Sequence, residues 1–145
     1  MKSLEYPLDT LGIVNLISER QVVLQQMANH TWEEYSDIKI SNSEWYIMAR
    51  IYGQKTTISM VTKNVTITRQ ATHKNIKSLE AKGLVEISNA EHNKRDKCIQ
   101  LTKLGEQCFK KYEEIKDQIE KKVAQNIGAE RLTLLKDILK MNWGI

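Results

Sequence analysis

The sequence has few of the residues that small specialised proteins depend on. It contains one proline, six glycines and two cysteines among 145 residues. This composition fits neither a disordered chain nor a loop-rich β-sandwich, and it favours a mostly helical fold. Cys98 and Cys108 have neither CxxC nor metal-ligand spacing, which argues against a structural zinc site and for a reducing compartment. A chain of this length can bury a core without metal or disulfides, so we expect no cofactor.

Long apolar runs and catalytic motifs are also missing. No run approaches the roughly 20 residues that cross a bilayer, and Met1–Tyr6 lacks the apolar core of a signal peptide. We therefore expect a cytoplasmic protein with no membrane partner. There is no GxSxG elbow, no glycine-rich phosphate loop and no pair of histidines with metal-site spacing, so we do not expect an enzyme.

Positive charge is concentrated in the middle of the chain. From Lys55 to Leu104 there are ten Lys or Arg residues against four acidic ones, a net charge of +6, whereas the other residues hold twelve cations and fourteen anions. A charge cluster can simply be a solvated face. Proteins that bind nucleic acid also concentrate their cations on one segment, so the middle segment is a candidate for DNA binding.

Apolar residues recur at helical spacing along most of the chain. They predict helices over residues 8–35, 42–52, 58–64, 69–82, 102–127 and 129–141. Ser41 and Glu44 have the spacing of a capping box, and Gly83 is placed to end the helix over 69–82. In that helix Thr72, Ile76 and Leu79 are expected to face the core.

Two short alternating segments, Leu84–Ser88 and Lys97–Leu101, predict a hairpin with a long polar tip at Asn89–Asp96, and no other segment has a strand pattern. Two short helices, a tight turn and a following hairpin are the element order of a winged helix-turn-helix. The predicted fold is thus mainly α with a small β-hairpin wing and long N- and C-terminal helices.

Several stretches resemble the MarR (multiple antibiotic resistance regulator) family of winged helix transcription factors. They are Ile67-Thr68-Arg69-Gln70, Leu79-Glu80-Ala81-Lys82-Gly83-Leu84-Val85, Asn93-Lys94-Arg95, Leu101-Thr102-Lys103-Leu104-Gly105 and Ile40-Ser41-Asn42-Ser43-Glu44-Trp45. The resemblance implies one domain over 1–145, with a DNA-binding lobe at 40–105 and dimerisation helices at 1–39 and 106–145. The family usually has aspartate where this chain has Asn93, and Asp96 is a candidate to orient Arg95 instead.

The likeness and the helical spacing together indicate the residues that would contact double-stranded DNA. The helix over 69–82 would expose Arg69, Gln70, His73, Lys74 and Lys77, with Thr68 at its start. Lys94 and Arg95 would reach a minor groove from the wing, or lie on a solvated turn. Thr57 and Ser59 would bind a phosphate, or serve as a simple helix cap.

The family forms homodimers through its terminal helices, commonly represses its target genes, and commonly binds a small aromatic or organic effector. Four aromatic residues could line an effector cleft here, although they could equally be plain core: Trp32, Tyr35, Trp45 and Tyr46. The alternative function is a helical protein–protein interaction module without specific DNA binding. That alternative explains the apolar stripes but not the cations of the middle segment.

Overall fold

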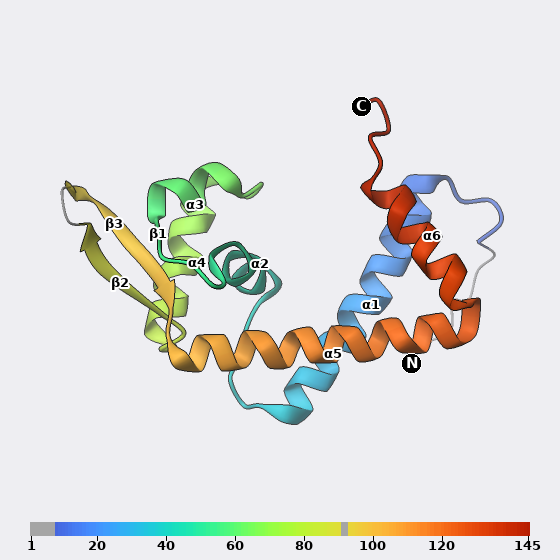
Figure 1. The fold of residues 1–145 in the computed structure, drawn as a ribbon, viewed down its shortest axis with the longest axis horizontal. Helices are drawn as coiled ribbons and strands as arrows, with labels where there is room; N and C mark the ends of the chain where they lie inside the picture. The colour runs from blue at the N-terminus through green and yellow to red at the C-terminus, as the bar shows by residue number, and fades with distance from the viewer. Residues whose placement is uncertain (1–7, 91–92) are drawn as a thin grey trace. The chain divides into compact units, whose positions relative to one another are not determined.

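The computed structural model describes residues 8–90 and 93–145. Its helices and strands follow one another along the chain as Figure 1 shows: α1 (Ile13–Tyr35), α2 (Asn42–Ile51), β1 (Thr56–Thr57), α3 (Ile58–Asn64), α4 (Arg69–Ala81), β2 (Val85–Ala90), β3 (Asn93–Leu101), α5 (Lys103–Ile127) and α6 (Ala129–Lys140). The predicted fold class, mainly helical with a small antiparallel wing, is confirmed. Among the described residues, no helix combines the length and the apolar character that crossing a membrane requires.

The chain divides into two compact units. Ser36–Tyr112 form one unit, and the described residues up to Tyr35 together with Glu113–Ile145 form the other. The first unit contains α2, α3, α4, the sheet and the beginning of α5. The predicted DNA-binding lobe at 40–105 therefore lies wholly inside it, while the idea that residues 1–145 act as one domain stays a prediction.

Local signals in the sequence set most helix ends. At the start of α2 the Ser41 hydroxyl accepts from the Glu44 amide at 3.1 Å, and the Glu44 carboxylate accepts from the Ser41 amide at 3.0 Å. This is the predicted capping box. Gly83 follows α4 with a φ of 74°, a left-handed conformation that glycine adopts without strain.

The first helix is shorter than predicted. It begins at Ile13 instead of Leu8, because the preceding residues close a turn in which the Leu11 amide donates to the Leu8 carbonyl at 3.1 Å. The helical ladder then starts at Gly12, whose carbonyl accepts from the Leu16 amide at 3.0 Å. The apolar spacing alone did not show where this turn gives way to the helix.

The sheet has three strands in the order β1-β3-β2, so two expectations were wrong. The strands of the hairpin extend to Ala90 and from Asn93, which leaves a much shorter tip than Asn89–Asp96. The strands extend beyond the two alternating segments because backbone hydrogen bonds between strands do not require alternating apolar and polar side chains. The third strand, β1, is two residues long and pairs with β3 (Thr56 with Ile99), a long-range contact that leaves no local pattern in the sequence.

The core of the first unit lies between α2, α4 and the sheet. Its completely buried side chains are Ile47, Met48, Ile51, Leu79 and Leu84. Thr72 is also buried, and its hydroxyl donates to the Thr68 carbonyl at 2.8 Å, so its polar atom is satisfied within α4. The predicted inward face of this helix is confirmed.

In the second unit, α6 has no buried residue, and a 2.7 Å ion pair joins Lys136 to Glu120 of α5. Many large apolar side chains of this unit are exposed. They belong to α1, α6 and the C-terminal tail: Ile13, Val14, Leu16, Ile17, Val22, Leu24, Leu134, Leu135, Ile138, Leu139, Met141, Trp143 and Ile145.

Candidate nucleic-acid interface

Helix α4 presents a polar face opposite its buried face. Thr68 is the N-cap residue, and its hydroxyl accepts from the Ala71 amide at 3.1 Å. The five side chains predicted to be exposed are all exposed, and together they line one shallow hollow on the surface: Arg69, Gln70, His73, Lys74 and Lys77. Because the opposite face is held in the core, this set cannot turn inward without unfolding the lobe.

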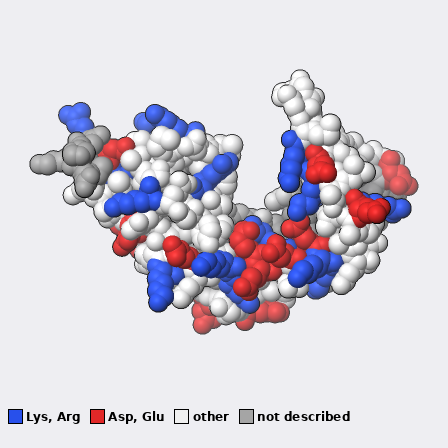
Figure 2. All heavy atoms as spheres, viewed as in Figure 1, with Lys and Arg blue, Asp and Glu red and all other residues white. Residues whose placement is uncertain are grey.

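A second hollow, with a volume of about 480 Å³, lies between α3, α4 and the wing. Its lining brings Arg69, His73 and Lys77 of α4 together with Arg95 and Lys97 of β3. Lys97 is exposed and was not among the predicted DNA contacts, although its alternation with Arg95 along the strand could have indicated it. The Lys94 side chain lies outside the described part of the chain. Figure 2 shows Lys and Arg side chains spread over the lobe of α2–α4 and the wing, with fewer acidic side chains between them on the face in view.

The start of α3 is capped from within the chain. The Thr57 hydroxyl accepts from the Met60 amide at 3.2 Å, and the Ser59 amide donates to the Asp96 carboxylate at 3.4 Å. Asp96 thus contacts α3, whereas the sequence suggested that it could orient Arg95. A carboxylate at this helix start also disfavours a second anion there, so the geometry favours the capping alternative for Thr57 and Ser59. Their contact with DNA phosphate stays a prediction.

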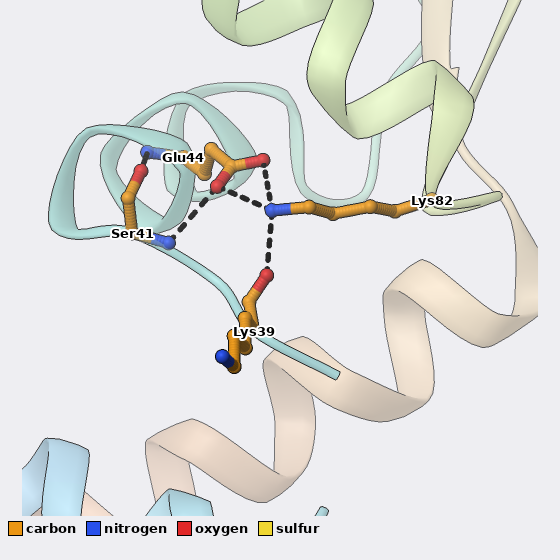
Figure 3. A network of polar contacts seen from close by, with 4 residues as sticks. All are labelled: Lys39, Ser41, Glu44 and Lys82. Atoms are coloured by element: carbon orange, nitrogen blue, oxygen red, sulfur yellow. Dashed lines mark hydrogen bonds and ion pairs between the residues drawn. The ribbon is translucent and has the colours of Figure 1, made fainter. Parts of the chain in front are cut away.

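A partly buried ion pair that the sequence did not predict joins α2 to the end of α4. The Lys82 ammonium donates to both Glu44 carboxylate oxygens at 2.8 and 2.9 Å and to the Lys39 carbonyl at 2.5 Å. Figure 3 shows the ammonium between these acceptors, with Ser41 bonded to the same carboxylate. The one signal in the sequence would have been an acid at the start of α2 and a lysine 38 residues later, at the end of α4.

The environment of Glu44 favours its charged form. Burial raises the pKa of this carboxyl, but hydrogen bonds from Lys82, the Ser41 amide and Ser78 outweigh burial, so its pKa lies below the usual range of glutamate. The Glu44 side chain is only 4% exposed, compared with 30% for Lys82. The pair is thus a fixed, charged contact inside the lobe.

The four predicted effector-binding aromatics belong to different units. Trp32 is buried and Tyr35 exposed in one unit, with ring centroids 5.6 Å apart. Trp45, in the other unit, is buried and stacks on Tyr112 at 4.0 Å. These contacts are typical of core packing, and an effector site at these residues stays a prediction.

Tyr46, the fourth of these aromatics, contacts the turn before α4. Its hydroxyl accepts from the Thr66 amide at 3.1 Å and lies 3.4 Å from the Thr66 hydroxyl oxygen. These hydrogen bonds lower the pKa of Tyr46. The Arg50 guanidinium lies over the Tyr46 ring at 5.5 Å from its centroid.

Two helices joined by a turn, a polar exposed second helix and a hairpin beside it define a winged helix protein. Residues 40–105 match the family model of the winged helix DNA-binding domain. Residues 40–105 are thus similar to winged helix DNA-binding domains, and the chain has the fold of the MarR regulators, so the resemblance seen in the sequence is confirmed at the level of the fold. None of the curated protein sequences matches the chain significantly.

Solved structures show this likeness over nearly the whole chain. The reduced form of MarR from E. coli has a TM-score of 0.75 at 19% identity, over 90% of this chain and 95% of that one. Wild-type apo MarR from E. coli has a TM-score of 0.71 at 18% identity, with coverages of 90% and 96%. The MepR–DNA complex from S. aureus has a TM-score of 0.72 at 21% identity, with coverages of 89% and 94%.

Proposed function

We propose that this protein is a cytoplasmic transcription regulator that binds a pseudo-palindromic DNA site as a homodimer, and that it acts as a repressor. The observation that carries the proposal is the exposed face of α4, where five polar or cationic side chains line one hollow. The match of residues 40–105 to a winged helix DNA-binding domain supports the same function. The S. aureus MepR structure of similar fold is a complex with DNA, which supports it further.

The positions along α4 suggest different roles for its side chains. Recognition helices enter the major groove with their N-terminal residues, so Arg69 and Gln70 are proposed to read base edges, Arg69 on guanine and Gln70 on adenine. His73 and Lys74 lie one turn further along. Lys77, two turns beyond Arg69, is proposed to bind phosphate and to fix the orientation of the lobe without reading sequence.

The wing extends this surface. Arg95 and Lys97 line the same cavity as Arg69 and Lys77, so one stretch of DNA backbone could contact both elements. Lys94 is proposed to contact DNA next to Arg95, as the sequence suggested. Asp96 within this cationic group limits how many phosphates the wing can neutralise.

The dimer is proposed to form through α1, α6 and the C-terminal tail. Val14 is 77% exposed, Leu134 is 59% exposed and Trp143 is 42% exposed, so an interface at these elements would remove large apolar side chains from water. A two-fold interface that buries such residues would present two copies of α4 to successive half-sites about 10 base pairs apart.

Selection from a random duplex pool, followed by fluorescence anisotropy on the best site and on a scrambled one, tests the DNA-binding part. We expect a palindromic site that binds at least about 1,000-fold more tightly than the scramble. Arg69→Ala should lower affinity for the selected site, whereas Lys122→Ala, a change at an exposed cation of α5, should not. Equal binding to both duplexes would favour the protein–protein interaction module instead.

Light scattering after size exclusion tests the dimer. The wild-type chain should elute with twice its mass of 16.8 kDa at micromolar concentration. Leu135→Glu combined with Leu139→Glu should give a folded monomer, because two charges would be buried at the proposed interface. A wild-type monomer would contradict this part of the proposal.

Release of DNA by a small aromatic or organic effector completes the proposal. An effector would act by favouring a dimer whose two α4 helices are wrongly spaced for DNA. Quenching of tryptophan fluorescence by a panel of phenolic compounds, repeated with Trp32→Phe and Trp45→Phe, tests it. A compound that releases DNA should lose affinity in at least one variant, and no release by any compound would count against it.

A further inference from the structure

We infer that α2 is the platform that fixes the recognition helix at both ends, with Glu44 and Tyr46 as positioning residues for DNA reading. Glu44 holds the residue that follows α4, and Tyr46 holds the turn that precedes it. The inference rests on the proposed function of α4 as the recognition helix. Neither Glu44 nor Tyr46 lines either hollow of the candidate interface.

The anchor at the C-terminal end is the Glu44–Lys82 pair. Lys82 is the C-cap residue of α4, and its own amide donates to the Ser78 carbonyl at 3.0 Å, so its backbone is part of the last helical turn. Its ammonium donates to both oxygens of Glu44, in the first turn of α2, and to the Lys39 carbonyl in the segment before that helix, which gives three directional contacts. Figure 3 shows that the extended Lys82 side chain reaches across to this group. Because the Glu44 carboxylate is itself held by the Ser41 amide, its charged hydrogen bond with Lys82 limits movement of α4 along the helix axis.

The anchor at the N-terminal end is the Tyr46 hydroxyl. It accepts from the amide of Thr66, which lies two residues before the N-cap residue Thr68. Arg50, one turn further along α2, packs its guanidinium against the Tyr46 ring and restrains the ring's orientation. The phenol therefore fixes the backbone of the turn from which α4 starts.

The two anchors at opposite ends of α4 restrain movements of the helix that the packing of its buried face does not prevent. Helix α4 has 13 residues and is thus about 20 Å long. Its buried side chains, Thr72, Ile76 and Leu79, set its depth, but apolar contacts have little directionality. Hydrogen bonds at the two ends set its tilt and its position along the axis. A side chain can form two hydrogen bonds to one base only if both the tilt and the axial position of α4 are correct.

The test compares Lys82→Met and Tyr46→Phe with the matched controls Lys122→Met and Tyr52→Phe, which change an exposed lysine of α5 and a tyrosine at the end of α2. We expect the ratio of specific to scrambled-site affinity to fall roughly threefold to tenfold in each anchor variant, the effect of about one hydrogen bond. The controls should keep the wild-type ratio. Affinity for the scrambled duplex should not change in any variant, because the phosphate-binding cations remain.

A merely structural role predicts a different result. In that case the anchor variants would lower the unfolding midpoint but keep the wild-type affinity ratio at a temperature where every variant is folded. That outcome would overturn the inference.

Hydrogen exchange provides a readout that needs no DNA. In Tyr46→Phe the Thr66 amide and the first turn of α4 should exchange faster than in wild type and in Tyr52→Phe. Unchanged protection would overturn the N-terminal anchor. If the wild-type chain shows no specific DNA binding, the proposed function fails. Faster exchange would then support the Tyr46 anchor as a restraint on α4, while the role of both anchors in DNA reading would be overturned.

Discussion

The backbone of Gly105 lies so close to the carbonyl group of Leu84 that a Cβ atom on residue 105 would be 2.0 Å from the Leu84 oxygen. Thr102 completes this junction: its hydroxyl donates to the Gly83 carbonyl at 2.6 Å and accepts from the Gly105 amide at 3.0 Å. The stretch from Leu101 to Gly105, part of the family resemblance, thus joins the first turn of α5 to the start of β2. Thr102 and Gly105 therefore have a structural role at this junction that does not depend on DNA.

Gly105→Ala should therefore destabilise the protein strongly. The new methyl group would meet a backbone oxygen, and the start of α5 or β2 would have to move, at a cost of about 3 kcal/mol. Urea unfolding followed by circular dichroism measures this change. The control is Gly12→Ala, where an added Cβ has no neighbour within 4 Å and the change replaces only an N-cap glycine, so the cost should be about 1 kcal/mol or less. Equal midpoints for the two variants would contradict the prediction.

Local signals were sufficient to predict most of the fold. The capping residues Ser41, Thr57 and Thr68 and the glycine after α4 each act on their nearest neighbours, so the sequence showed where α2, α3 and α4 begin and end. The exposed face of α4 followed from its 3.6-residue period, because the inward positions are apolar or, at Thr72, self-satisfied.

Contacts between distant residues were not predictable in this way. The pairing of β1 with β3, the Glu44–Lys82 pair and the Ser59–Asp96 contact join residues at least 37 positions apart. No local spacing marks them. From the sequence, Asp96 was a candidate to orient its neighbour Arg95, and its contact with the Ser59 amide could not be foreseen. The hydrogen bond from the Thr66 amide to Tyr46 could not be foreseen either, and the effector site at Tyr46 stays a prediction.

The Glu44–Lys82 pair should make stability depend on pH in the acid range. The pKa of Glu44 is lower in the folded state than in the unfolded chain, so its charge stabilises the fold above the ordinary glutamate pKa of about 4.3. This contribution is lost as pH falls through the folded-state pKa. Near neutral pH, Glu44→Gln should lower the free energy of unfolding by about 2 kcal/mol.

Unfolding midpoints of wild type and Glu44→Gln, measured from pH 7 to pH 3, check the sign. The difference between the two proteins should be constant above about pH 5 and should shrink below the ordinary glutamate pKa. Glu114→Gln, which changes an exposed acid of α5, is the control. A difference that grew as the pH fell would contradict the assignment.

The two cysteines should react at different rates. Cys108 is buried, and burial raises the pKa of its thiol, so little of the reactive thiolate is present at neutral pH. Cys98, on β3, is half-buried. Labelling with a disulfide reagent should show a fast phase that Cys98→Ser removes and a slow phase that Cys108→Ser removes. A faster reaction at Cys108 than at Cys98 would contradict the burial of Cys108 in this structure.

Lys77 and Arg69 should affect DNA binding in different ways. Lys77→Ala should weaken the selected and the scrambled duplex by the same factor and lower the slope of log affinity against log salt by about 1, because one phosphate contact is lost. Arg69→Ala should weaken the selected site by about 1–3 kcal/mol and reduce discrimination at one base pair of each half-site. Anisotropy titrations at four salt concentrations separate the two effects. If Lys77→Ala reduced discrimination while Arg69→Ala changed only the salt slope, α4 would enter the groove by its other end, and the anchoring at Lys82 would then lie nearer to the bases than the anchoring at Thr66.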